Sequence, residues 1–296
     1  MEAVRKQLHT EYAKQHNLTG KNITVAVLDS GVWGGHPDLY DRLLFFNDLV
    51  KHNKKPYDDN SHGSHVSGII CGTGKMSRGR YQGIAPESRL IMLKVLDKFG
   101  NGDIETMLKG IDWVIRNKNR YQIRILNLSV GGSDDLDGKE SIQLQEKVEE
   151  AWNLGIVVVA AAGNNGPAEC SVTVPGNSPK VITVGSSKDA IGVGRKKKQI
   201  FYAGRGPTIQ CVMKPEIVAP ADAIVSCSNN NRYYSAKSGT SMAAPIVSGA
   251  VALLLEKEPK LTPKEVKRRL MNCAIDLGLP SNQQGWGMLD IERLLK

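Results

Sequence analysis

Three residues whose types suit acyl-transfer chemistry stand at special points of this 296-residue chain: Asp29, His62 and Ser241. A serine hydroxyl is a weak nucleophile until a neighbouring base takes its proton. A histidine serves as that base when a carboxylate holds its ring in the correct tautomer. Each residue alone has an ordinary explanation, so the segments that position the three decide whether they form one site.

Asp29 follows an apolar, mostly β-branched run at residues 23–28, which predicts a strand buried on both faces. In open α/β sheets, ligands and chemistry gather at the carboxyl ends of strands. Asp29 stands at such an end, whereas Asp38 and Asp41 in the following loop do not. An aspartate that merely caps a loop or helix is the alternative.

His62 stands at the start of a helix predicted near residues 62–72, after the start signals Asn60 and Ser61. His65 lies one turn further along the same face. Two such histidines can share a metal ion, but the familiar zinc spacing is i, i+4 with a glutamate between. We therefore expect no metal here and give His65 a structural, hydrogen-bonded role.

Ser241 begins the most apolar helix of the chain, predicted over residues 241–257. A helix that is hydrophobic on nearly every face is a buried central helix. Its positive end favours negative charge on an attacking oxygen or an oxyanion. Gly239 lets the preceding loop approach closely. An ordinary N-cap serine is the alternative.

The surroundings of these three residues resemble the signatures of the subtilase family of serine proteases. The matching segments are Val-Leu-Asp29-Ser-Gly, Asn-Ser-His62-Gly-Ser-His and Gly-Thr-Ser241-Met-Ala-Ala-Pro, with further similarity at residues 127–132, 157–164, 204–208 and 214–220. The order Asp, His, Ser is that of subtilisin. The resemblance runs from about residue 20 to the C-terminus. It implies a subtilisin-like three-layer α/β fold and a serine endopeptidase, and it extends to intracellular bacterial members of the family.

The order of predicted elements agrees with that fold. Strands are predicted at residues 23–28, 89–96, 123–130, 156–162 and 181–186, and helices near 62–72, 103–119, 141–154 and 241–257. Such alternation indicates a mostly parallel sheet with helices on both faces. A last helix begins with a capping box at Thr262 and Glu265. We expect an N-terminal helical extension at residues 1–19 and one catalytic domain at 20–296.

The resemblance also implies a role for each catalytic residue. Ser241 attacks the scissile carbonyl, His62 takes its proton, and Asp29 orients and stabilises the imidazolium. Asn164, which follows the strand predicted at residues 156–162, occupies the family's oxyanion-hole position beside the backbone N–H of Ser241. A turn residue in a Gly-Asn-Asn-Gly stretch is the alternative for Asn164.

By the same resemblance, a peptide substrate lies as an added strand between two backbone edges. One edge is Ser129, Val130 and Gly131, and the other is Gly100 and Gly102. Ala161, Ala162 and Gly163 form a small-walled, uncharged pocket, and Leu96, Ile104, Met107 and Val130 form a second apolar pocket. We expect medium or large apolar side chains at P1. Ordinary core packing is the alternative for Leu96.

No cofactor is expected. Asp38 matches a position that binds calcium in many subtilisins, but residues 72–80 of the partner loop carry basic side chains and no carboxylate. A hard divalent cation prefers oxygen ligands. We therefore expect no calcium at this site and assign no metal ligands, with calcium at a different site as the alternative.

Protein or peptide substrates are the expected partners. The net charge of +9 includes a basic run at residues 195–198, for which a solvated loop is the simpler explanation. The chain is only 5% aromatic and no aromatic residue interleaves with that run, which disfavours a nucleic-acid partner. No run of 18 apolar residues predicts a membrane span.

The first twenty residues are polar and the five cysteines are odd in number. This pattern favours reduced thiols in a cytoplasmic enzyme. A secreted enzyme is the alternative, if the sequence is a trimmed catalytic domain. Two other functions fit the same residues: a catalytically silent peptide-binding relative, and a transpeptidase in which an amine resolves the acyl-enzyme.

Overall fold

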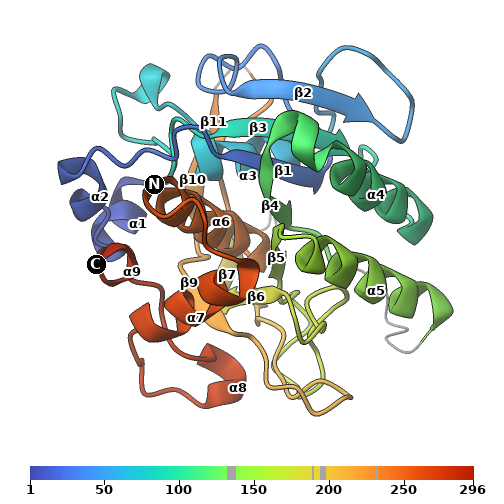
Figure 1. Cartoon of the computed structure of the whole chain (residues 1–296), viewed down its shortest axis with the longest axis vertical. Helices are drawn as coiled ribbons and strands as arrows, with labels where there is room; N and C mark the ends of the chain where they lie inside the picture. Colours follow the sequence, from blue (N-terminus) through green and yellow to red (C-terminus); the bar gives the residue numbers. More distant parts are fainter. Residues whose placement is uncertain (132–137, 189, 194–197, 231–232) are drawn as a thin grey trace.

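Seven parallel strands form the central layer of the protein (Figure 1). A computed structural model describes residues 1–296 except 132–137, 189, 194–197 and 231–232. In spatial order the strands are β2 (Leu43–Asp48), β3 (Arg89–Lys94), β1 (Thr24–Asp29), β4 (Ile123–Leu128), β5 (Val157–Ala161), β6 (Ile182–Ser186) and β9 (Ile217–Ala219). Every neighbouring pair is parallel, so the carboxyl ends of all seven strands face the same side.

Helices cover both faces of this sheet, which confirms the expected three-layer α/β fold. Helices α4 (Ile104–Tyr121) and α5 (Lys139–Asn153) pack on one face, and α3 (His62–Cys71) and α6 (Thr240–Lys257) pack on the other (Figure 1). Helix α6 is long and apolar enough to cross a membrane, but 83% of it is buried within the protein. It is therefore the predicted central helix of the core.

The five predicted strands are all present, and the two that sequence patterns missed are the edges of the sheet. Strand β2 is mostly half-exposed along its length. Strand β9 is only three residues long and follows Pro215. The half-exposed β2 has a weak apolar pattern, and the buried β9 is too short to show one.

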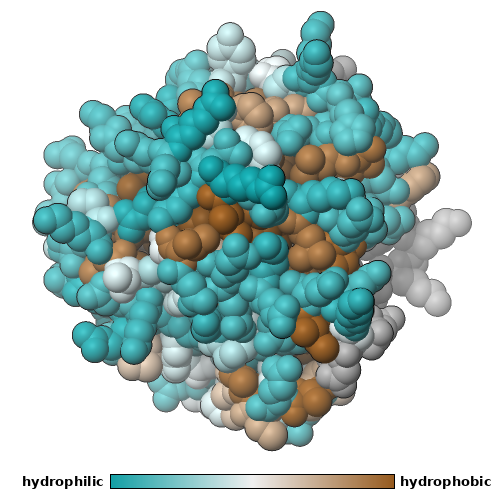
Figure 2. Space-filling view, turned by 45° about the vertical axis from the view of Figure 1, so that its right-hand side comes forward, coloured by the Kyte–Doolittle hydropathy of each residue, from teal (hydrophilic) through white to brown (hydrophobic). Residues whose placement is uncertain are grey.

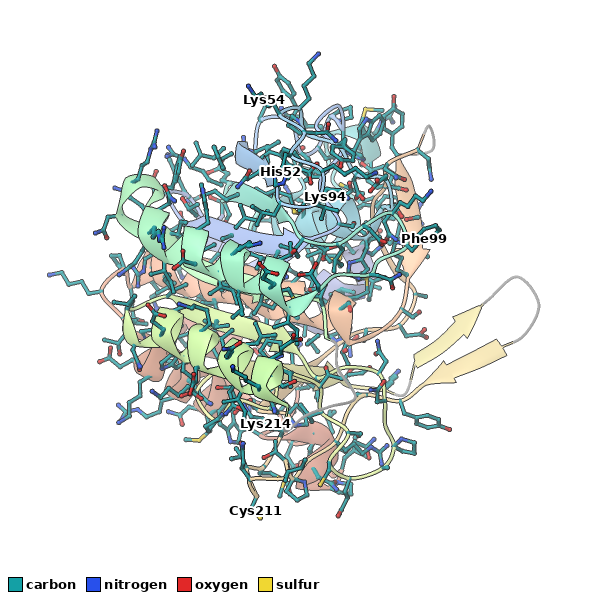
Figure 3. All side chains as sticks on the ribbon, turned by 90° about the vertical axis from the view of Figure 1, so that its right-hand side faces the viewer. His52, Lys54, Lys94, Phe99, Cys211 and Lys214 are labelled. Carbon is teal, nitrogen blue, oxygen red and sulfur yellow. The ribbon has the colours of Figure 1, made fainter. Side chains whose placement is uncertain are left out.

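Two antiparallel hairpins lie outside the sheet. The hairpin of β7 (Ala190–Val193) and β8 (Lys198–Phe201) projects from the body of the molecule (Figure 3). Lys198, the last residue of the basic run, begins β8, and residues 195–197 lie outside the described residues. The hairpin of β10 (Ile224–Cys227) and β11 (Tyr234–Lys237) packs against α3 and leads directly into α6.

The N-terminal extension packs against the C-terminal end of the chain. Its helices are α1 (Glu2–Gln7) and α2 (Glu11–Gln15), and α2 contacts α9 (Ile291–Leu295). Leu8 is fully buried, and its carbonyl accepts a hydrogen bond of 3.0 Å from the backbone N–H of Ile291. The extension therefore shares the core of the catalytic domain.

The remaining helices are short or peripheral: the 3-10 helix η1 (Lys75–Ser77), α7 (Pro263–Cys273) and α8 (Ser281–Gln284). Helix α7 begins with the predicted capping box, in which the side chains of Thr262 and Glu265 each bond the other's backbone N–H. The face drawn in Figure 2 is mainly hydrophilic, and its hydrophobic residues form separate patches.

Candidate active site

The three predicted catalytic residues meet at the carboxyl edge of the sheet. Asp29 is the last residue of β1, His62 is the first of α3, and Ser241 lies in the first turn of α6. The Nδ1 atom of His62 lies 2.8 and 2.9 Å from the two carboxylate oxygens of Asp29. Because this contact fixes the proton on Nδ1, Nε2 is left free as the base.

The charge state of His62 is set by opposing effects. Burial lowers the pKa of His62, while the charge and hydrogen bond of Asp29 raise it, and the net result is a pKa above the ordinary value. Asp29 is fully buried, whereas the His62 side chain is 22% exposed. A protonated His62 is therefore stabilised by Asp29, and its ring stays partly exposed.

Asp58, which sequence patterns did not single out, positions the start of α3. Ser61 stands at the N-cap but makes no capping bond with its side chain. Instead the carboxylate of Asp58 accepts bonds from the backbone N–H groups of Ser61 (2.8 Å) and Ser64 (2.9 Å) and from the Ser30 hydroxyl (2.9 Å). One carboxylate thus ties the helix that carries His62 to the turn after Asp29. The sequence feature that could have identified Asp58 is its place shortly before Asn60 and Ser61, the residues that indicate the helix start.

A close backbone approach completes this junction. The N–H of Gly63 donates to the Ser30 hydroxyl at 2.9 Å. A Cβ atom at Gly63 would lie 2.0 Å from the carbonyl oxygen of Gly31, so only glycine fits there. The glycine directly after His62 therefore lets α3 contact the end of β1.

Lys94 supports the same edge of the sheet and was also missed. It is the last residue of β3, pairs with Asp29 in the strand register, and is fully buried. Its ammonium, labelled in Figure 3, donates to the carbonyls of Ser30 (2.6 Å) and Leu96 (2.9 Å) and to the carboxylate of Asp59 (2.6 Å). It therefore joins the loops that leave β1 and β3.

Asn164 is held beside the start of α6. Its Oδ1 accepts a hydrogen bond of 3.1 Å from the N–H of Thr240, which directs the amide nitrogen away from that contact. Gly239 has a φ of +130°, and a Cβ atom there would lie 3.3 Å from the Asn164 Nδ2. The amide of Asn164 thus lies against the first turn of α6, the segment that carries Ser241.

His62, Asn164 and Ser241 line one cleft with a volume of about 620 Å³. In the part of the chain that the structure describes, the Ser241 hydroxyl makes no hydrogen bond to His62. Catalytic hydrogen bonds are often long without substrate and tighten when it binds. The geometry is therefore that of a triad whose Asp–His half is formed and whose serine lies in the same cleft.

Most of the predicted substrate-binding residues line this cleft as well. They are Leu96, Gly100, Gly102, Met107, Ser129, Val130, Gly131, Ala161 and Gly163. Ile104 and Ala162 do not: Ile104 packs against the core, and Ala162 is fully buried. Sequence patterns missed Phe99, which is 72% exposed at the rim (Figure 3), and Thr173, which packs between Gly131 and Gly163.

His65 has the structural environment that was expected. Its Nε2 lies 2.9 Å from the carbonyl oxygen of Ile224 and 3.1 Å from that of Ser235. Burial lowers the pKa of His65 to about 3, so the ring is neutral. It joins α3 to the hairpin of β10 and β11, and its Nε2 is engaged by protein carbonyls.

Comparison with known proteins places this site in a family. The model of the subtilase family matches residues 20–287. Serine protease AprX of Bacillus subtilis is 42% identical over 86% of this chain, which spans 62% of the length of AprX. Subtilisin of Bacillus pumilus is 36% identical over 97% of this chain and 95% of its own. The crystal structure of a cold-adapted subtilisin-like serine proteinase has a TM-score of 0.75 and 29% identity, covering 93% of this chain and 90% of that one. This protein belongs to the subtilase family of serine proteases.

Proposed function

We propose that this protein is an endopeptidase that hydrolyses peptide bonds through an acyl-enzyme. The observation that carries the proposal is the contact between His62 and Asp29 in the cleft that also holds Ser241 and Asn164. Ser241 attacks the scissile carbonyl while His62 removes its proton. His62 then protonates the leaving amine, and water resolves the acyl-enzyme by the same route.

Oxyanion stabilisation completes the chemistry. Negative charge develops on the carbonyl oxygen only as the tetrahedral intermediate forms, so donors fixed beforehand stabilise the transition state more than the substrate. Asn164 Nδ2 and the N–H of Ser241 are the proposed donors. Because Asn164 is already bonded to Thr240, the site needs little reorganisation when the intermediate forms.

We also propose an apolar P1 preference, with Thr173 limiting the size of the side chain. Ala161, Gly131 and Gly163 form uncharged walls around the P1 position. The side chain of Thr173 lies between the two glycines, where their absent Cβ atoms leave room for it. Since Thr173 occupies this space, medium apolar side chains fit better than large ones.

The residues around Asp38 do not fit calcium. We propose that protein groups there take the structural role that a bound calcium ion would have. The Asp38 carboxylate already accepts bonds from the Tyr234 hydroxyl (2.6 Å) and the Met76 N–H (3.1 Å). The Arg5 guanidinium donates to the carbonyls of Gly79, at 2.8 Å, and Gln82. The positively charged side chain of Arg5, on α1, thus binds loop carbonyl oxygens of the kind that would coordinate a metal cation.

A softer metal is also not proposed for this region. Ligand atoms of His36, Asp38 and Cys227 lie within 4.8 Å of one another. However, His36 Nε2 is 2.7 Å from the carbonyl of Tyr233, and His36 Nδ1 accepts from the N–H of Asp38 at 3.0 Å. Both ring nitrogens are therefore engaged within the protein.

Proteins and peptides are the substrates that the family implies. The relatives include a protease described as extracellular, so they do not support the expected cytoplasmic location. The secreted alternative fits them better. The odd number of cysteines and the polar N-terminal residues are the sequence features that favour a cytoplasmic location, and all five cysteines are free in the structure.

Substitution of Ser241 by alanine tests the endopeptidase proposal. The wild type should cleave casein and be inactivated by a phosphonyl fluoride, with one adduct per chain at Ser241. The Ser241→Ala variant should do neither, because it lacks the nucleophile. Equal cleavage by both proteins would contradict the proposal. Neither an adduct nor cleavage with the folded wild type would favour the silent binder, because that protein has no activated serine. Faster aminolysis than hydrolysis of the acyl-enzyme would favour the transpeptidase.

Replacement of Thr173 by glycine tests the proposed P1 pocket. Peptide p-nitroanilides that differ only at P1 should show kcat/KM higher for leucine than for phenylalanine with the wild type. Thr173→Gly should raise the phenylalanine-to-leucine ratio by about tenfold or more, because added pocket volume is worth roughly 1–3 kcal/mol. An unchanged ratio would show that Thr173 does not limit the pocket.

Thermal unfolding tests the proposed calcium independence. Excess EDTA should leave the Tm unchanged, while Arg5→Gln should lower it by roughly 3–10 °C because it removes two charge-assisted hydrogen bonds. Lys6→Gln, an exposed cation on the same helix, is the matched control and should have little effect. A large fall in Tm with EDTA, reversed by calcium, would overturn this proposal.

A further inference from the structure

A second cleft, with a volume of about 480 Å³, lies at the edge of the sheet opposite to the active site. Of the residues that line it, Asn153 ends α5 shortly before β5, and Lys180 stands shortly before β6. Both lie at the amino ends of parallel strands, whereas the catalytic residues lie at the carboxyl ends. Among the residues that the structure describes, the two clefts share none. A ligand in the second cleft therefore leaves the active site open.

Apolar side chains from three separate segments line this second cleft. Trp152 comes from the last turn of α5, Met271 from α7, and Trp286 from the segment after α8. Trp152 is 9% exposed, Trp286 is half-buried, and Met271 is 43% exposed. A methionine side chain adapts to apolar partners of different shapes. The cleft thus presents an apolar contact surface, and its volume is typical of ligand sites.

The same cleft carries positive charge. Within the described residues, its lining includes no carboxylate and four cations: Lys180, Lys264, Lys267 and Arg268. Two of the four already have protein partners. The Lys267 ammonium lies 2.8 Å from a carboxylate oxygen of Glu216, and the Lys180 ammonium donates to the Asn153 side chain at 3.0 Å. Lys264 and Arg268 are exposed, and in the described part of the chain neither side chain forms an ion pair or a hydrogen bond.

The stability of α7 does not explain these two charges. Lys264 is the second residue of α7, where a cation opposes the helix dipole. Arg268 follows four residues later on the same face, where like charges repel. The carboxylate of Glu265, which lies between them in sequence, accepts bonds from the N–H and the hydroxyl of Thr262 at 2.8 and 2.7 Å. Lys264 and Arg268 are therefore available to a ligand.

We propose that the second cleft is a docking site for an acidic peptide segment of a partner protein. In this segment, carboxylates stand next to an aromatic or long aliphatic side chain. Charge complementarity identifies the occupant, because its carboxylates pair with Lys264 and Arg268 while its apolar side chain contacts Met271 and Trp286. The inference does not rest on the proposed endopeptidase function, since binding here needs none of the catalytic residues.

Single-stranded nucleic acid is the other polyanion that combines with cations and aromatic rings. It stacks its bases on exposed ring faces. Trp152 is almost fully buried, and the Lys267 ammonium lies over its ring, 5.9 Å from the ring centre. An acidic peptide needs contact with apolar atoms but no free ring face, so it fits this lining better.

Titration with a defined peptide tests the proposal. The probe is the acetylated and amidated peptide Glu-Asp-Phe-Glu-Glu-Leu, and the protein is the Ser241→Ala variant, which lacks the nucleophile and so leaves the probe intact. Isothermal titration calorimetry should show saturable binding that weakens as the salt concentration rises. The neutral analogue Gln-Asn-Phe-Gln-Gln-Leu should bind about threefold more weakly or worse, because it loses the exposed ion pairs. Replacement of its phenylalanine by alanine should also weaken binding of the acidic probe.

Variants of the cations locate the site. Lys264→Gln combined with Arg268→Gln, in the same Ser241→Ala background, should weaken binding of the acidic probe by about threefold or more. The matched control is Lys54→Gln combined with Lys55→Gln, which removes the same net charge from an exposed loop outside the cleft and should retain the affinity. Lys264→Glu combined with Arg268→Glu should make the protein prefer the neutral peptide.

Three results would overturn the inference. They are the absence of saturable binding, an equal affinity of the two double glutamine variants for the acidic probe, and tighter binding of an oligothymidylate than of the acidic probe. The endopeptidase proposal is judged separately. A wild type with Ser241 that carries Lys264→Gln and Arg268→Gln should still hydrolyse a short p-nitroanilide at the unaltered rate, because the second cleft lies away from the catalytic residues.

Discussion

The contact between Asp29 and His62 is the constraint on which the rest of the site depends. A fully buried carboxylate is costly unless it is hydrogen-bonded, and Asp29 is compensated by His62 and by the N–H of Ser30. The arrangement requires that the end of β1 and the start of α3 be fixed to within a fraction of an ångström. Asp58 supplies this by bonding both segments with one carboxylate.

The parallel sheet brings the site residues together through the common direction of its strands. Because the strands run in one direction, β1 and β5 deliver Asp29 and Asn164 to the same edge, and α3 and α6 start there. Two positions without a Cβ atom, Gly63 and Gly239, allow backbone segments to meet closely enough for the polar groups to touch. The chemistry is thus carried by residues at the ends of rigid elements, which is where a site is positioned best.

Much of this was predictable from sequence, for physical reasons that differ from residue to residue. Asp29, His62, Asn164 and Ser241 stand next to long apolar segments, whose periodicity identifies strand ends and helix starts. Asp58 lies in a polar loop and Lys94 within the apolar strand predicted at residues 89–96. The roles of both, and of Thr173, depend on contacts with residues distant in sequence. Patterns in the local sequence cannot reveal such contacts. Ile104 was predicted to line the cleft but packs against the core. Its apolar character fits either position, so the sequence does not distinguish them.

The pH dependence of amide hydrolysis tests the central claim most directly. If Asp29 holds and charges His62 as described, kcat/KM of the wild type should fall with decreasing pH around a midpoint above the ordinary histidine value of about 6.5. Asp29→Asn should lose about 10⁴-fold in kcat, the loss known for the corresponding change in the chymotrypsin-type triad. A midpoint at or below 6.5 in the wild type, or an Asp29→Asn variant of near wild-type activity, would contradict the account.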